Sequence, residues 1–162
     1  MSALMSDLAQ DLISRLAAKG WQIRCAESCT AGLISATLTS VSGSSDVVDR
    51  GFVTYSNQAK TEMLNVQAKT LETYGAVSAE TAFEMVVGTH ASHEDTIASI
   101  AVTGIAGPNG GTDEKPVGTV YIGTSIPRQE AVITHNLFDG DRESVRTQTV
   151  EAALIQLRDM LI

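Results

Sequence analysis

The chain has 162 residues, of which 43% are hydrophobic and 19% charged, and this predicts one globular domain over residues 1–162 rather than a disordered chain. Nineteen acidic against eleven basic side chains give a formal net charge of -8, which argues against nucleic acid or anionic membranes as partners. No apolar run is long enough to span a membrane and the start has no signal-peptide pattern, so we expect a cytoplasmic protein.

The first part of the chain predicts a helix, a strand and a second helix. Apolar residues at helical spacing indicate an amphipathic helix over residues 2–19, which ends at Gly20. A short strand follows over residues 21–26, and the polar turn at residues 27–30 leads into a helix from residue 33. The only cysteines are four positions apart, with no second Cys or His pair at zinc spacing, so we expect neither a metal site nor a disulfide.

The middle of the chain continues the alternation of strands and helices. Aromatic and β-branched residues predict a strand over residues 51–56, after which Asn57 caps a helix that carries Lys60 on its first turn. Ser78 starts another helix. The small and β-branched run at residues 99–103 predicts a strand that is covered on both faces.

The last part of the chain predicts strands over residues 117–124 and 131–138 and a closing helix over residues 141–161. The alternation of elements gives an α/β fold class, a single three-layer α/β/α sandwich. The sheet should be mixed and mainly parallel, because the last strands follow one another with no helix between them.

The turn AESCTAG, residues 26–32, is the first candidate site. Ser28 and Thr30, with the free N–H groups at the helix start near Gly32, are able to bind an anion, since these donors and the helix dipole point at the turn. Ordinary helix capping is the alternative.

The segment at residues 43–60 holds two adjacent serines, a tyrosine and a lysine. A serine hydroxyl is a weak nucleophile unless a base removes its proton, and a lysine amine serves as that base if burial lowers its pKa. Serine and lysine therefore form a complete catalytic pair, although the spacing alone also fits two unrelated surface residues.

Residues 103–119 contain a glycine-rich loop after the buried strand. Gly104, Gly107 and Gly110 permit positive φ angles and close backbone approach, which suits an anion or an oxyanion. The spacing matches neither the phosphate loop nor the dinucleotide fingerprint, and a structural Ω-like loop is the alternative.

Arg142 and Arg146 lie one turn apart at the start of the last predicted helix, where cations suggest an anionic ligand. Pairing with Asp139, Asp141 or Glu143 is the alternative. A histidine-based triad is not expected, because the three histidines lie outside all these segments: His90, His93 and His135.

Taken in order, AESCTAG, GSSDVVDRGFVTYSNQAK, VTGIAGPNGGTDEKPVGTVY and FDGDR resemble the C-terminal amidase domain of the CinA family, from Asp7 to about Leu161. The resemblance implies hydrolysis of nicotinamide mononucleotide to nicotinate mononucleotide and ammonia, in pyridine-nucleotide salvage. It implies no metal and no organic cofactor. Many relatives have glycine where this chain has Ala31, so we do not expect a left-handed turn at that position.

The resemblance also implies roles for individual residues. Ser45 is the expected nucleophile, Lys60 the neutral base and Tyr55 its assistant, with Arg142 also in the site; Ser28 and Ser44 are the next candidate nucleophiles. The phosphate and ribose are expected to contact Arg142 and residues of the glycine-bearing loops: Ser28, Thr30, Gly32, Gly104, Gly107 and Gly110. We expect a homo-oligomer. A catalytically idle pyridine-nucleotide-binding or assembly module, or an enzyme for another amide, are the alternatives.

Overall fold

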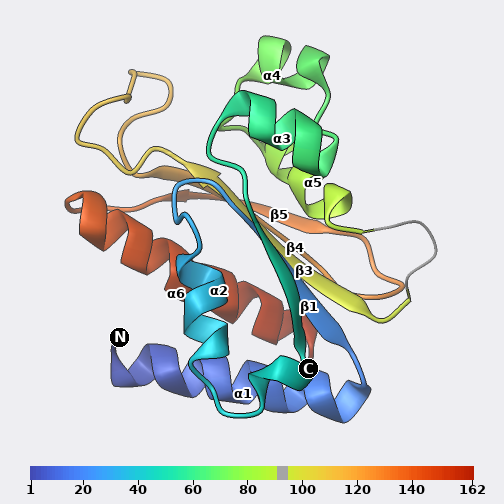
Figure 1. The fold of residues 1–162 in the computed structure, drawn as a ribbon. Helices are drawn as coiled ribbons and strands as arrows, with labels where there is room; N and C mark the ends of the chain where they lie inside the picture. Colours follow the sequence, from blue (N-terminus) through green and yellow to red (C-terminus); the bar gives the residue numbers. More distant parts are fainter. Residues whose placement is uncertain (91–94) are drawn as a thin grey trace.

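The structure, a computed structural model, describes residues 1–90 and 95–162 and contains one mixed sheet with the strand order β2-β1-β3-β4-β5 (Figure 1). Its strands are β1 (Gln22–Glu27), β2 (Val48–Val53), β3 (Ile97–Gly104), β4 (Thr119–Ser125) and β5 (Val132–Leu137). β1 pairs in parallel with β2 and β3, whereas β4 is antiparallel to β3 and β5. β4 thus runs against the shared direction of the other strands, and the predicted mixed, mainly parallel sheet is confirmed.

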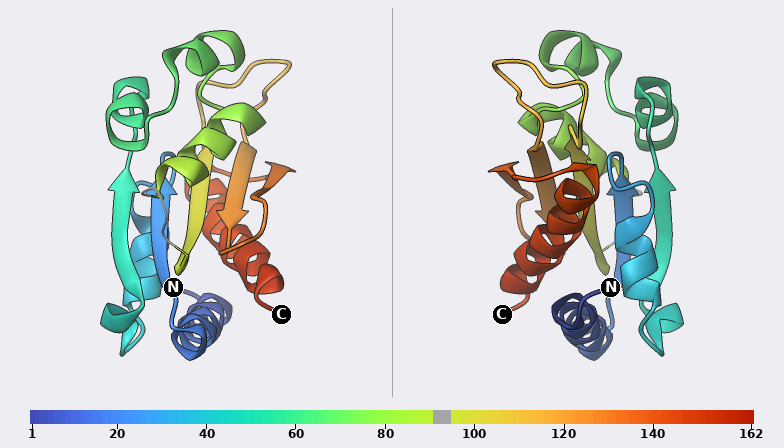
Figure 2. Two further views of the ribbon diagram at one scale, coloured as in Figure 1. Left: turned by 90° about the vertical axis from the view of Figure 1, so that its right-hand side faces the viewer. Right: turned by 90° about the vertical axis from the view of Figure 1, so that its left-hand side faces the viewer.

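Helices cover both faces of this sheet, which confirms the three-layer sandwich (Figures 1 and 2). One face is covered by α1 (Ala3–Lys19), α2 (Leu33–Thr39) and α6 (Arg142–Met160). The other is covered by α5 (Ala79–Gly88), on which α3 (Asn57–Leu64) and α4 (Ala68–Tyr74) pack. No helix of the described ranges is both long and apolar enough to cross a lipid bilayer.

The apolar side chains form two cores, one on each face of the sheet. The larger core joins the sheet to α1, α2 and α6 and includes Leu12, Ile100 and Leu154, each fully buried. The smaller core lies under α5 and includes Met85 and Ala101. Burying one such large side chain contributes about 1.5–3 kcal/mol, so the two cores together hold the sheet rigid between its helices.

Side-chain caps start several helices where the sequence predicts them. Ser78 accepts a hydrogen bond from the N–H of Thr81 at the start of α5. Asp141 accepts one from the N–H of Ser144 at the start of α6. These oxygens satisfy backbone donors that have no partner within the helix.

The region around β2 differs from its prediction. β2 lies three residues earlier than expected, at Val48–Val53 rather than 51–56, and Ser56 rather than Asn57 caps α3 by accepting from the N–H of Ala59. The last bond to β1 is the one from the N–H of Thr54 to the carbonyl of Glu27, after which the chain leaves the sheet. α4 was not expected, because none of its residues is fully buried and Leu71, which packs against the smaller core, is only partly buried, so its apolar face is narrow.

The carboxyl ends of β1, β2 and β3 meet at one edge of the sheet, because these strands are parallel neighbours. The turn at residues 26–32, α3 and the glycine-rich loop after β3 all lie at this end (Figures 1 and 2). The residues just before β2 lie at the opposite end, beside α1 (Figure 2). Loops at the carboxyl ends of parallel strands are the usual place for a binding site in such folds.

Candidate active site

Lys60 and Ser28 meet at the carboxyl end of the sheet. Ser28 directly follows β1, and Lys60 lies on the first turn of α3, which follows the neighbouring strand β2. The Nζ atom of Lys60 is 3.0 Å from the Oγ atom of Ser28, and it also donates to the carbonyls of Thr54 at 2.7 Å and Tyr55 at 3.3 Å. Lys60 is 1% exposed and Ser28 is 8% exposed, so the contact is shielded from bulk water.

Burial lowers the pKa of Lys60 from 10.5 to about 8, and the nearby Cys29 thiol opposes this shift only in part. At pH 7 about one molecule in ten then carries a neutral amine at this position. A neutral amine has two N–H groups and one lone pair, and the carbonyls of Thr54 and Tyr55 are able only to accept. When Lys60 is neutral, its lone pair therefore faces the hydroxyl of Ser28, a geometry in which a lysine is able to act as a base for a serine.

The expected pair of Ser45 and Lys60 is not formed. Ser45 is exposed and lies in the short 3-10 helix η1 (Ser44–Asp46), before the start of β2, where Val48 pairs with the first residues of β1. Lys60 follows the other end of β2, and a strand of this length spans roughly 17–20 Å. Ser44 lies in the same helix at the same end of the sheet. The structure does not bring Ser45 and Lys60 together, because a whole strand separates two segments that are near each other in sequence.

Glu27 caps α2 from inside the protein. Its carboxylate is 1% exposed and accepts from the backbone N–H groups of Ile34 and Ser35 and from the hydroxyl of Thr30, at 2.8, 3.0 and 2.7 Å. The helix start and the Thr30 hydroxyl are therefore occupied by the protein's own carboxylate. Helix capping, the alternative interpretation of this turn, is correct for these groups, and an anion bound by Thr30 and the helix donors near Gly32 is not supported.

Ala31 has a φ angle of 47°, which lies in the left-handed region and contradicts the expectation for this position. Its N–H donates to the carbonyl of Ser28, and Gly32 follows with a φ of 98° as the N-cap of α2. The closed turn and the anchored helix hold Ala31 in a conformation that alanine alone disfavours.

Arg142 and Arg146, both on α6, donate hydrogen bonds to the segments around the site. Arg142 donates from Nη1 to the carbonyl of Gly107 at 2.8 Å and from Nη2 to the hydroxyl of Tyr55 at 3.2 Å. Arg146 donates to the carbonyls of Cys29 and Thr30, at 3.0 and 3.1 Å.

Neither arginine forms an ion pair with Asp139, Asp141 or Glu143 among the described contacts, so the alternative of local ion pairing is wrong here.

A cleft of about 180 Å³ opens at this edge of the sheet. It is bordered by the Ser28–Lys60 pair, by Tyr55 and Arg142, and by Thr103 and Gly104 at the end of β3. A Cβ atom at Gly104 would lie 2.6 Å from the side chain of Val120, so only glycine fits there. Tyr55, which is 61% exposed, lies on the open side of the cleft.

The predicted glycines take different places around the cleft. Gly104 lines it, and Gly107, with a φ of 83°, contacts Arg142 through its carbonyl. Gly110, with a φ of 94°, is exposed and lies outside the cleft lining, as do Thr30 and Gly32. The structure therefore brings part of the predicted glycine-rich loop to the cleft, but not every glycine in it.

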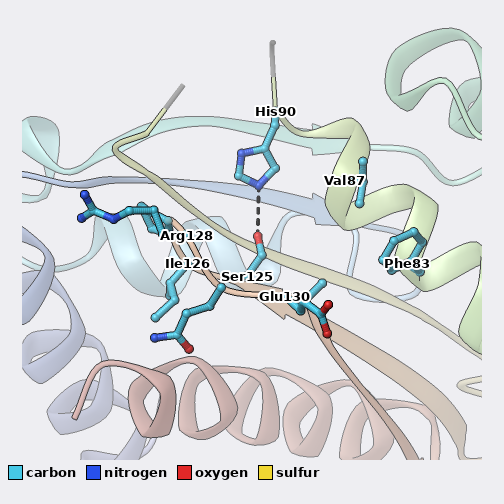
Figure 3. A pocket seen from close by; sticks show the side chains of 10 residues that line it. Phe83, Val87, His90, Ser125, Ile126, Arg128 and Glu130 are labelled. Atoms are coloured by element: carbon cyan, nitrogen blue, oxygen red, sulfur yellow. Dashed lines mark hydrogen bonds between the residues drawn. The ribbon is translucent and has the colours of Figure 1, made fainter. Parts of the chain in front are cut away.

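A larger cavity of about 610 Å³ lies at the other end of the sheet (Figure 3). Phe83 and Val87 of α5 border it, and the Nε2 atom of His90 is 3.0 Å from the Oγ atom of Ser125 at its base. None of the site residues predicted from the sequence lines this cavity. Its size does not identify a site of chemistry, whereas the smaller cleft is bordered by the contact between Ser28 and Lys60.

His135 does not border the cleft. His135 stacks on Tyr121, with ring centroids 4.7 Å apart, and His93 lies outside the described residues. Within the described ranges no group of three or more His, Cys, Asp or Glu side chains gathers as a metal site.

Comparison with known proteins gives a family match over nearly the whole chain. The model of the CinA C-terminal domain matches residues 5–161. The nicotinamide-nucleotide amidohydrolase PncC of Enterobacter agglomerans is 48% identical over 158 residues, which cover 97% of this chain and 93% of that protein. The PncC of Escherichia coli strain K12 is 41% identical over 151 residues, 93% of this chain and 90% of that protein.

Solved structures show the same fold. The competence/damage inducible protein CihA from Agrobacterium tumefaciens is 43% identical and superposes with a TM-score of 0.91, covering 96% of this chain and 94% of that one.

A CinA-like protein of Syntrophobacter fumaroxidans is 48% identical over 143 residues, which are 88% of this chain but only 33% of that protein. The domain therefore also occurs as part of longer chains.

Proposed function

The chain belongs to the CinA C-terminal domain family, and we propose that it hydrolyses the carboxamide of nicotinamide mononucleotide, yielding nicotinate mononucleotide and ammonia in pyridine-nucleotide salvage. The names of two relatives that match along almost their whole length support this reaction. The observation that carries the chemistry is the contact between the buried Nζ of Lys60 and the Oγ of Ser28.

The first half of the reaction is acylation of Ser28. The neutral amine of Lys60 takes the hydroxyl proton as the Oγ atom forms a bond to the amide carbon, and the carbonyl electrons move onto oxygen. When the tetrahedral intermediate collapses, the C–N bond breaks, and the lysine ammonium returns the proton to the departing nitrogen, which leaves as ammonia. A nicotinoyl ester on Ser28 remains.

The second half is hydrolysis of that ester. Lys60, neutral again, takes a proton from a water molecule that attacks the ester carbon. The bond to Oγ breaks and the proton returns to Ser28, which releases the carboxylate product. The carbonyls of Thr54 and Tyr55 keep the Nζ atom in place through both halves.

Arg142 and Tyr55 fit a role in binding the part of the substrate that does not react. They border the open side of the cleft, and the cleft itself is too small to enclose a whole nucleotide. A guanidinium at this position favours the phosphate and ribose end of the mononucleotide. Binding energy from that end orients the carboxamide against Ser28.

A catalytically idle binding module is the second candidate. The buried, desolvated lysine beside a serine argues against it, since a binding role alone does not need a base at that position. The cytoplasmic location and the homo-oligomeric state expected from the sequence stay predictions.

The test is ammonia release by the purified protein from nicotinamide mononucleotide, with free nicotinamide, its riboside and NAD as comparisons. We expect rapid release from the mononucleotide and much slower release from the riboside and from nicotinamide. Equal rates with the riboside would remove the role of the phosphate, and binding of the mononucleotide without ammonia release would favour the idle module.

A further inference from the structure

The turn that follows Ser28 contains a strained residue. Ala31 has a φ angle of 47°, and Gly32 follows with a φ of 98°. The N–H of Leu33 donates to the carbonyl of Thr30 at 3.1 Å, which closes a four-residue turn around these two residues. Turns with positive φ at both central positions favour asparagine, aspartate or glycine there, and alanine adopts this region only at a cost in free energy. Ala31 is exposed, so contacts of its neighbours, and not burial of its methyl group, hold this conformation.

The peptide between Thr30 and Ala31 is held at both of its polar groups. Its N–H, from Ala31, donates to the carbonyl of Ser28 at 3.1 Å. Its carbonyl, from Thr30, accepts from the Nη2 atom of Arg146 at 3.1 Å as well as from Leu33. A peptide unit is planar, and the φ angle of Ala31 is the rotation about the bond that joins this plane to the Cα atom of Ala31. Fixing the plane therefore restrains φ at the strained position.

Arg146 holds this segment from outside the cleft. Its Nε atom donates to the carbonyl of Cys29 at 3.0 Å, so one guanidinium contacts both carbonyls between Ser28 and Ala31. Arg146 lies near the start of α6 and is not among the residues that border the cleft, whereas Ser28 and Cys29 border it. Arg146 thus contacts the segment of the proposed nucleophile without reaching the space where a substrate binds.

Lys60 is held independently of this turn. The carbonyls of Thr54 and Tyr55, which accept from its Nζ atom, follow β2 rather than β1. If Ala31 returned to a negative φ angle, the peptide before it would rotate and its bond to the carbonyl of Ser28 would break. Ser28 would then shift while Lys60 stayed, and the 3.0 Å contact between Oγ and Nζ would lengthen. A displacement of about 1 Å between reacting groups is enough to lower a rate about 10²-fold.

We propose that Arg146 is a positioning residue that keeps Ala31 in the left-handed conformation and thereby keeps the hydroxyl of Ser28 beside the amine of Lys60. This role rests on the proposed function, in which Ser28 is the nucleophile. Because Arg146 does not border the cleft, its loss should lower kcat and leave KM nearly unchanged. Because Ala31 is the strained residue, its replacement by glycine should reduce the need for Arg146.

The first measurement is kcat and KM for nicotinamide mononucleotide in Arg146→Gln and Arg146→Lys. The matched control is Arg158→Ala, because Arg158 lies at the far end of α6 and its guanidinium donates to Asp159. We expect kcat to fall about 10²-fold in Arg146→Gln with little change in KM, and the control to keep wild-type kinetics. Arg146→Lys should recover only part of kcat, because one amine does not match a guanidinium that contacts two carbonyls. Wild-type kcat in Arg146→Gln, or a rise in KM alone, would overturn the proposal.

The second measurement is a double-mutant cycle with Ala31→Gly. Glycine adopts positive φ angles about as readily as negative ones, so Ala31→Gly alone should keep wild-type kcat. In the Arg146→Gln background, Ala31→Gly should raise kcat about tenfold, because the left-handed conformation is no longer disfavoured there. Ala36→Gly, which replaces another exposed alanine of the same region but within α2, should give no such rise. Equal effects of Ala31→Gly with and without Arg146 would contradict a role through Ala31.

Two comparisons separate this proposal from a loss of structure and from a failure of the proposed function. Far-UV circular dichroism shows whether Arg146→Gln folds, and if it does not, Arg146→Lys with and without Ala31→Gly gives the same cycle. If Ser28→Ala is inactive while Arg146→Gln keeps full kcat, the positioning role fails and the proposed mechanism stands. If Ser28→Ala retains wild-type turnover, the proposed mechanism fails, and with it the reason to position Ser28.

Discussion

The Nζ atom of Lys60 lies 3.0 Å from the Oγ atom of Ser28, although the two residues are 32 positions apart in the chain. The contact exists because Ser28 ends one strand and Lys60 follows its parallel neighbour, so both reach the same edge of the sheet. Two backbone carbonyls direct the amine toward the serine, and burial lowers the pKa of Lys60 to about 8. These are the features that the proposed mechanism needs for a serine nucleophile with a lysine base.

The pH dependence of catalysis should follow Lys60. Since the free enzyme needs the neutral amine, kcat/KM should rise with pH and level off above an apparent pKa near 8. In Lys60→Met this limb should disappear together with most of the activity, about 10²-fold or more. Steady-state rates between pH 6 and about pH 9.5 measure it, and a limb that persists in the variant would assign the titration to another group.

Protein stability should also depend on the protonation of Lys60. Below pH 8 the lysine is protonated in the folded and the unfolded chain, and its buried charge costs folding free energy. Between pH 8 and 10.5 the unfolded chain binds a proton that the folded chain has released, so the free energy of unfolding rises with pH.

Relative to Lys60→Met, the wild type should therefore gain about 1–3 kcal/mol over this range. Denaturant unfolding of both proteins at the two pH values measures the difference. If the difference in free energy of unfolding between the wild type and Lys60→Met is the same at both pH values, the pKa of Lys60 is not lowered.

Much of the fold is predictable from local patterns. The apolar period of α1, the caps at Ser78 and Asp141 and the buried run of β3 each have a direct physical cause in the sequence. α4 is not predictable in the same way, because none of its residues is fully buried and its apolar face is narrow.

The contact between Ser28 and Lys60 is harder to predict from the sequence than the fold is. Ser45 is nearer to Lys60 along the chain than Ser28 is, but β2 carries the chain from one end of the sheet to the other between them. Knowledge that β1 and β2 are parallel neighbours would have identified Ser28, since it marks which segments share an edge. The capping role of Glu27 was likewise missed, although an acidic residue before a helix start was a signal for it.

Arg142 should matter to catalysis more than to folding. Arg142 is exposed, so Arg142→Ala should change the free energy of unfolding by no more than about 1 kcal/mol, while kcat/KM falls about 10- to 100-fold. Arg142→Lys should rescue poorly, because one amine does not reach both the carbonyl of Gly107 and the hydroxyl of Tyr55. Tyr55→Phe, which removes only one of these partners, is the matched comparison. Unchanged kinetics in Arg142→Ala would show that Arg142 only stabilises the glycine-rich loop and does not act on the substrate.

Glu27→Gln should destabilise the fold. The carboxylate accepts from two N–H groups of α2 and from two hydroxyls, and an amide replaces one acceptor oxygen by a donor that faces these donors. We expect the free energy of unfolding to fall by about 2–3 kcal/mol. Ser35→Ala, which removes one hydroxyl donor, should cost less. Thermal and denaturant unfolding measure both variants, and an undiminished stability in Glu27→Gln would contradict the capping role.

The most direct test of the central claim compares ammonia release from nicotinamide mononucleotide by Ser28→Ala and Ser45→Ala under identical conditions. The Ser28–Lys60 pair predicts that Ser28→Ala loses turnover by about 10³-fold or more while still binding the mononucleotide, since the nucleophile and its base act as one unit. Ser45→Ala, at the opposite end of the sheet, should keep wild-type turnover. Wild-type turnover in Ser28→Ala, or loss of turnover confined to Ser45→Ala, would contradict the account.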